Sequence, residues 1–203
     1  MKILHTSDWH LGHHLYGRRR YEEFRRFLAW LVDLIRDEGV EALIIAGDVF
    51  DSSIPGNPAQ KLYYDFLRDV SASGSPCRHV VVIAGNHDSP AFLDAPAGLL
   101  SGMNIHVTGR ARSPEEETFL LCGASGEPEL VVSAVPFLRD RDLYRAADGD
   151  SMDERDRLMA EGMKEHYLRA AQEAERLRAG HPVPLLATGH LFAAGGVISG
   201  GDG

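Results

Sequence analysis

Cysteine is scarce in this chain, which has only Cys77 and Cys122 among its 203 residues. Two cysteines are too few for the disulfide framework of a small secreted domain. The chain has no apolar run near the roughly 18 residues of a membrane span, and polar Ser7 and Asp8 come too early for a signal peptide. It also lacks an internal repeat and a linker long enough to mark a second domain. These absences predict one cytoplasmic domain without membrane association.

The composition is that of a globular protein. Hydrophobic residues make up 44% and charged residues 25% of the chain, which excludes disordered, collagen-like and coiled-coil classes. A chain of this length buries about 70% of its unfolded surface and needs no disulfide or metal in order to fold. Its net charge of −9 would repel nucleic acid if the sum alone decided, and ten histidines are many for this length. The positions of the histidines and arginines therefore have to indicate the function.

The first half of the chain alternates strand and helix. Apolar runs predict strands at 2–6, 42–46 and 79–84, and apolar residues at helical spacing predict helices at 21–38 and 58–70. The run 42–46 is apolar throughout, as in a strand that is buried on both faces. This βαβαβ order predicts a parallel sheet with covering helices.

The second half changes character. Short apolar runs at 104–108, 118–122 and 130–135 are separated by turn residues and predict a second, more antiparallel sheet. Ser151 and Glu154 have the spacing of a capping box, so a long helix is expected to begin there and to end before Gly180. A last strand follows at 183–188. We predict the α/β class, with two sheets face to face and helices outside, in a four-layer αββα sandwich.

Four of the predicted strands end in polar clusters. The clusters are Ser7-Asp8-Trp9-His10-Leu11-Gly12, Gly47-Asp48-Val49-Phe50-Asp51, Gly85-Asn86-His87-Asp88 and Gly189-His190. Ligands of α/β sheets bind beyond the carboxyl ends of the strands, so clusters that are distant in sequence can converge. Carboxylate, imidazole and amide ligands suit manganese, iron or zinc in a hydrolytic centre, and the absence of cysteine disfavours a structural zinc site. One such cluster alone is usually a turn or a helix cap, whereas four in this order are hard to obtain from turns.

These clusters resemble the motifs of the calcineurin-like metallophosphoesterases over residues 1–190. The first two resemble those of the nuclease branch, the SbcD-type nuclease subunits, whereas protein phosphatases of the superfamily typically show G-D-x-H-G, G-D-x-x-D-R-G and G-N-H-E. The resemblance implies a DNA phosphodiesterase, acting as a double-strand exonuclease and single-strand endonuclease in DNA repair and hairpin processing. It implies two Mn²⁺ ions, with Mg²⁺ or another divalent cation as the alternative. It also implies an SbcC-type coiled-coil ATPase as partner, and a homodimer whose interface includes parts of the apolar stretches at 62–67 and 92–100, most of which core packing explains.

The resemblance also assigns roles to individual residues. It implies five metal ligands, namely Asp8 and His10 for the first ion, Asn86 and His190 for the second, and Asp48 as the bridge between them. It implies that His87 is not a ligand but faces the scissile phosphate and protonates the leaving oxygen. Asp51 would orient His87.

Arginines gather just after the first polar cluster. Residues 17–26 hold five arginines and two glutamates, at the start of a predicted helix where cations oppose the helix dipole. We therefore expect Arg18, Arg19 and Arg20 to contact the phosphates of DNA, with a solvated helix face as the alternative. His14 lies in the same loop and is a candidate substrate contact, or simply an exposed loop histidine.

The chain departs from the family pattern in one respect. The family places a further G-x-H or G-H-x-H motif after the Gly-His strand, and the sequence up to Gly203 contains no such motif. We therefore expect residues 1–203 to form a metallophosphoesterase domain that is incomplete at its C-terminus, without the family's cap domain and with only three ligands for each metal. Two other functions stay open: hydrolysis of a small phosphate ester, and a non-catalytic DNA-binding scaffold.

Overall fold

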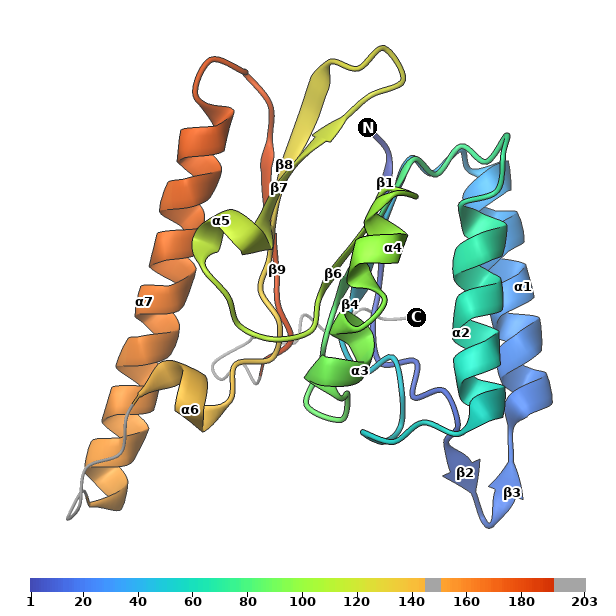
Figure 1. The fold of residues 1–203 in the computed structure, drawn as a ribbon, viewed down its shortest axis with the longest axis horizontal. Helices are drawn as coiled ribbons and strands as arrows, with labels where there is room; N and C mark the ends of the chain where they lie inside the picture. The colour runs from blue at the N-terminus through green and yellow to red at the C-terminus, as the bar shows by residue number, and fades with distance from the viewer. Residues whose placement is uncertain (145–150, 192–203) are drawn as a thin grey trace, which may run out of the picture.

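Two sheets pack face to face with helices outside them, as a computed structural model of residues 1–144 and 151–191 shows (Figure 1). The first sheet has the order β1-β4-β5-β6 and is parallel throughout. Its strands are β1 (Ile3–Thr6), β4 (Ala42–Ala46), β5 (His79–Ile83) and β6 (Ile105–Thr108). Helices α1 (Tyr21–Asp37) and α2 (Asn57–Val70) cover its outer face, and the short α3 (Pro90–Asp94) and α4 (Ala97–Ser101) lie against β6. The predicted αββα sandwich is confirmed.

The second sheet has the order β7-β8-β9. Strand β7 (Thr118–Cys122) runs antiparallel to β8 (Pro128–Ala134), and β9 (Leu185–Thr188) runs parallel to β8. The long helix α7 (Met152–Arg178) covers this sheet, together with the short α5 (Pro114–Glu117) and α6 (Asp140–Leu143). The hydroxyl of Ser151 accepts a hydrogen bond from the Glu154 N–H at 3.2 Å, so the predicted cap of this helix is present.

One strand lies in a different sheet from the one expected. The apolar run at 104–108 was predicted to join the second sheet, but β6 pairs in parallel with β5, with Val80 opposite Ile105. Helices α3 and α4 form the connection that a parallel pair requires. Ile105 and Val107 are both buried, as in a strand covered by other elements, and four residues carry no pattern that selects a partner strand.

The core has two main layers because side chains alternate across the first sheet. Leu43 and Ile45 of β4 point into the layer beneath α1 and α2. Ala42, Ile44 and Ala46 point into the layer between the two sheets, where they meet apolar residues of β7 and β8. Because both faces of β4 are buried, its carboxyl end is held rigidly at the sheet edge, which positions the residues that follow it.

A small hairpin stands apart from both sheets. Strands β2 (His14–Leu15) and β3 (Arg18–Arg19) pair antiparallel just before α1. Figure 1 shows this hairpin at the end of the molecule where β1 and β4 lead into their following loops. Among the helices of the described residues, none combines the length and apolar character that a bilayer crossing demands.

Candidate metal centre

The four polar clusters meet in one cavity of about 430 Å³ beyond the ends of β1, β4, β5 and β9. The side chains of this cavity come from segments far apart in sequence, and include His5, Ser7, Asp8, His10, Asp48, Asn86, His87, Phe137 and His190. All five predicted metal ligands and the predicted proton donor therefore line the same space. His5 and Phe137 also line it and were not expected there, because neither stands in a polar cluster.

Asp48 is the centre of the arrangement. Its side chain is only 4% exposed, and its Oδ1 accepts a hydrogen bond from the main-chain N–H of His87 at 2.9 Å. Its Oδ2 lies 3.6 Å from Nε2 of His10 and 3.6 Å from Nε2 of His190. These separations are too long for hydrogen bonds, and they leave room for cations between the carboxylate and the imidazoles.

Two groups of side chains have the spacing of metal sites, and Asp48 belongs to both. One group is His10, Asp48 and His87, and the other is Asp8, Asp48 and His190, with donor atoms within 4.8 Å of one another in each. One carboxylate common to two groups is the arrangement expected of a bridge between two cations. The grouping differs from the resemblance, which joined Asp8 to His10 and left His87 out, although Asp8 Oδ1 is also 3.9 Å from His10 Nε2.

His190 shows that the donors fit a cation. Its Nδ1 donates a hydrogen bond to the Ala46 carbonyl oxygen at 2.9 Å, so Nε2 of the neutral ring carries a lone pair. That lone pair faces the amide oxygen Oδ1 of Asn86 at 3.1 Å. Two lone pairs pointing at each other repel, and a divalent cation beside them removes the repulsion. Nitrogen, carboxylate and amide donors of this kind suit the divalent metals that the phosphoesterases use.

The backbone of the ligand loops is strained. Asp8, His10 and Asp48 all have φ in the left-handed region, at 56°, 47° and 48°. Non-glycine residues rarely adopt this conformation, and such strain concentrates at functional sites. Gly47 and Gly85 leave the necessary space, since a Cβ at Gly47 would collide with the His190 ring and one at Gly85 with the Asp48 carboxylate.

Asp88 has a structural role that its sequence pattern did not predict. Its side chain is buried and accepts hydrogen bonds from the N–H groups of Val49 at 3.1 Å, Phe50 at 2.9 Å and Gly85 at 2.9 Å. Burial raises the pKa of Asp88, and the three N–H donors oppose that shift. The carboxylate thus ties the loop after β4 to the loop after β5. Its place in the Gly85-Asn86-His87-Asp88 cluster was a signal, but the direction of the three donors was not.

The contact between Asp51 and His87 differs from the one expected. We expected the Asp51 carboxylate to orient His87, but Nδ1 of His87 donates to the main-chain carbonyl of Asp51 at 3.2 Å. The carboxylate Oδ1 instead lies 2.8 Å from Nδ1 of His13 and 3.5 Å from Nδ1 of His10. The reason is the backbone pairing of Leu11 with Phe50, which turns the next side chain toward the His10–His13 loop.

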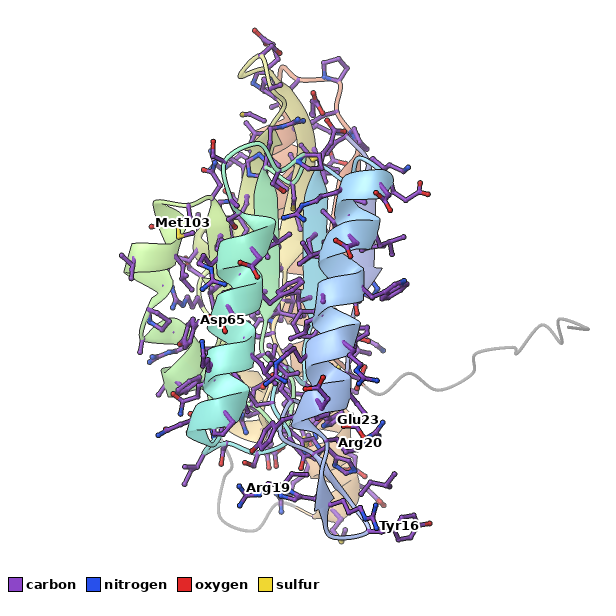
Figure 2. The ribbon with its side chains drawn as sticks, turned by 90° about the vertical axis from the view of Figure 1, so that its right-hand side faces the viewer. Tyr16, Arg19, Arg20, Glu23, Asp65 and Met103 are labelled. Atoms are coloured by element: carbon purple, nitrogen blue, oxygen red, sulfur yellow. The ribbon has the colours of Figure 1, made fainter. Side chains whose placement is uncertain are left out.

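The predicted nucleic-acid contacts lie on the rim rather than in the cavity. His14, Arg18 and Arg19 belong to the exposed β2–β3 hairpin, and Arg20 precedes the first turn of α1 (Figure 2). Arg20 does line a second cavity of about 300 Å³, whose walls also include Trp9, His10, His13, Phe24, Asp51 and His87. Because His10 and His87 belong to both cavities, the second one adjoins the metal centre.

A further arginine near the site was not expected from the sequence. The Arg139 guanidinium donates a hydrogen bond to the Asp88 carbonyl at 3.1 Å and lies 5.9 Å from the centre of the Phe137 ring. The main-chain N–H of Phe137 donates to the Ala84 carbonyl at 2.8 Å. These contacts join the segment after β8 to the loop that carries His87. Arg139 stands 51 residues from Asp88 in sequence, so no local pattern could have indicated it.

Comparison with known proteins agrees with this centre. Residues 1–191 match the family described as calcineurin-like phosphoesterase. The chain is 36% identical over 195 residues to the SbcD subunit of nuclease SbcCD from Escherichia coli (strain K12), covering 96% of this chain and 47% of that protein. It is 37% identical over 210 residues to the corresponding nuclease subunit of Rhodobacter capsulatus, covering 99% of this chain and 50% of the relative. For that of Bacillus subtilis the identity is 35% over 199 residues, with 97% and 48% covered.

The chain thus spans about half the length of the curated relatives it matches. The family match, in contrast, extends over nearly all of this chain and includes every ligand and catalytic position discussed above. The chain belongs to the calcineurin-like phosphoesterase family.

Proposed function

We propose that this chain carries the catalytic centre of a metal-dependent DNA nuclease of the SbcD type. The observation that carries the proposal is the buried Asp48 carboxylate, which two groups of ligand atoms share beside the half-exposed imidazole of His87. The relatives, which are named as SbcCD nuclease subunits, support a nuclease activity. A role in DNA repair and hairpin processing, a cytoplasmic location, a homodimer and an SbcC-type coiled-coil ATPase as partner belong to this proposal.

The metal ligands in this proposal are Asp8, His10, Asp48, Asn86 and His190. Two bound divalent cations, Mn²⁺ in our proposal, would stabilise charge on the phosphodiester and lower the pKa of water. The protein supplies the geometry around them. Asp48 is fixed by the His87 N–H, and His190 is held in one tautomer by the Ala46 carbonyl, so both present one defined donor atom to the cavity.

His87 is placed for the proton step. Its Nδ1–H is directed to the Asp51 carbonyl, so the proton at Nε2 is the one that can be exchanged. That Nε2 lies 4.0 Å from Asp48 Oδ2, at the floor of the cavity, while about half of the side chain stays exposed. Imidazole groups titrate near neutrality, which suits this side chain to protonating a leaving oxygen.

The decisive experiment compares substrates. Full-length protein with Mn²⁺ is assayed on duplex DNA, on single-stranded DNA and on bis-p-nitrophenyl phosphate, with EDTA as the metal-free control. We expect metal-dependent cleavage of DNA, and loss of that cleavage together with Mn²⁺-induced thermal stabilisation in Asp48→Asn. Cleavage of only the small ester would establish a phosphodiesterase of another kind. DNA binding without hydrolysis of either substrate would establish a scaffold.

The three arginines give a separate prediction. Changing Arg18, Arg19 and Arg20 together to alanine is expected to weaken DNA binding equally for all sequences, because phosphate contacts carry no base information. The slope of log affinity against log salt should fall by as much as about 2.7, or roughly 0.9 for each lost phosphate contact. Fluorescence anisotropy at several salt concentrations measures both quantities.

The matched control removes the same charge elsewhere. Arg36, Arg157 and Arg169 are exposed residues on α1 and α7, and their triple alanine variant should keep the wild-type slope. Equal slopes in the Arg18–Arg20 variant and in wild type would show that these arginines are merely a solvated surface.

A further inference from the structure

The tip of the β2–β3 hairpin is an unusual place for an aromatic residue. Tyr16 and Gly17 form its two-residue turn, with φ values of 49° and 74°. Such turns favour Asn-Gly, because the first position also needs a left-handed backbone. Tyr16 is 97% exposed, so packing within this chain does not compensate for the strain. A strained and fully exposed tyrosine points to a contact outside the fold.

The surroundings of Tyr16 define the chemistry of that contact. Leu15 on one side of the turn is half exposed, and Arg18 and Arg19 on the other side are exposed. Within residues 1–144 and 151–191, neither arginine has an ion-pair partner. Figure 2 shows Tyr16 and Arg19 beyond the first turn of α1, pointing to opposite sides of the hairpin. The tip therefore offers an aromatic ring beside cations, which is complementary to a base and its phosphates.

The hairpin is continuous with the metal centre. His13 and Arg20 flank it at its two ends, and both line the 300 Å³ cavity that also contains His10 and His87. Tyr16 is three residues from His13, or about 10 Å along an extended strand. Stacked nucleotides repeat at about 3.4 Å along one strand, so the ring lies roughly three nucleotides from this cavity.

We infer that the hairpin is a base-stacking finger, and that the substrate class of this centre is DNA with unpaired nucleotides near the scissile phosphate. The inference rests on the proposed nuclease function. The Tyr16 ring stacks on an unpaired base of any identity, and Arg18 and Arg19 hold the adjacent phosphates. Bases inside a duplex are already stacked, so the finger favours overhangs and single strands over blunt ends.

The test uses the full-length protein in EDTA, where binding is measured without cleavage. Fluorescence anisotropy compares a duplex with a single-stranded overhang, the single strand and a blunt-ended duplex. Tyr16→Ala is expected to lose about 5- to 150-fold in affinity for the first two and to bind the blunt duplex as wild type does. Tyr16→Phe keeps the ring and should keep the affinity. Leu99→Ala, which removes another exposed apolar side chain, is the control.

A second readout reports stacking directly. An overhang carrying 2-aminopurine should lose fluorescence on binding wild type and Tyr16→Phe, but not on binding Tyr16→Ala. Cleavage assays with Mn²⁺ separate the two proposals. If the protein cleaves DNA and Tyr16→Ala binds the overhang as wild type does, the finger is overturned and the nuclease function stands. If wild type binds no DNA and hydrolyses only bis-p-nitrophenyl phosphate, the nuclease function fails and the finger fails with it.

Discussion

Replacing His87 with glutamine lowers the rate of phosphodiester hydrolysis by about 10²- to 10⁴-fold, the usual contribution of a positioned general acid. The physical reason is the ring's hydrogen bond to the Asp51 carbonyl, which commits Nδ1 and makes Nε2 the proton-exchanging atom. Glutamine has no group that titrates near neutral pH. Single-turnover cleavage of labelled DNA measures the loss. Divalent-metal binding, followed by calorimetry, is expected to stay at the wild-type level.

The metal measurement matters because the structure offers His87 two roles. One of its ring nitrogens is grouped with His10 and Asp48 at metal-ligand spacing, whereas the family resemblance places it outside the ligand set. If His87→Gln binds Mn²⁺ much more weakly than wild type, His87 is a ligand and the proton-donor assignment is wrong. His181→Gln, which changes an exposed histidine beyond α7, controls for the loss of an imidazole and should leave both quantities unchanged.

Replacing Asp88 with alanine lowers the free energy of unfolding by about 3–5 kcal/mol, because three buried N–H groups lose their acceptor. These groups belong to Val49, Phe50 and Gly85. Each unsatisfied buried donor costs about 1–3 kcal/mol, and relief of the buried carboxylate offsets part of the sum. Urea unfolding of the metal-free protein measures the difference. Metal binding should weaken as well, because the two loops that Asp88 joins carry Asp48 and Asn86.

The conservative variant sharpens this prediction. Asp88→Asn keeps one acceptor oxygen and the side-chain volume, so its stability should fall between those of wild type and Asp88→Ala. Asp156→Ala, at an exposed position of α7, should change stability by less than about 0.5 kcal/mol. A loss below about 1 kcal/mol in Asp88→Ala would show that water replaces the carboxylate and that the tie between the loops is weak.

Local sequence patterns located most elements because strand and helix periodicities are local properties. The apolar run 42–46 is β4, and the helical pattern at 21–38 is α1, which ends one residue earlier at Asp37. The partner of a short strand is a different matter. Strand β6 has four residues, and its pairing with β5 depends on how α3 and α4 fill the connection rather than on its own sequence.

The convergence of the four clusters was also predictable, because parallel strands end at a common edge and the ligands follow those ends. The atoms that meet there were not predictable. Asp51 reaches His87 through its carbonyl instead of its carboxylate, and Asp8 groups with His190 as well as lying near His10. Both depend on the left-handed turns at the ligand residues, which φ preferences of Asp and His alone would not suggest.

The sequence by itself determined the residue types of the centre, their order along the chain and their position at strand ends, because these follow from composition and local periodicity. Only the tertiary structure decided which donor atoms face one another, that Asp88 binds two loops together, and that Tyr16 stands exposed beside the site. The hydrogen bonds that orient the site join residues 36 to 144 positions apart, from His87 with Asp51 to His190 with Ala46. The packing of the two sheets and their loops sets such contacts, and no short stretch of sequence specifies them.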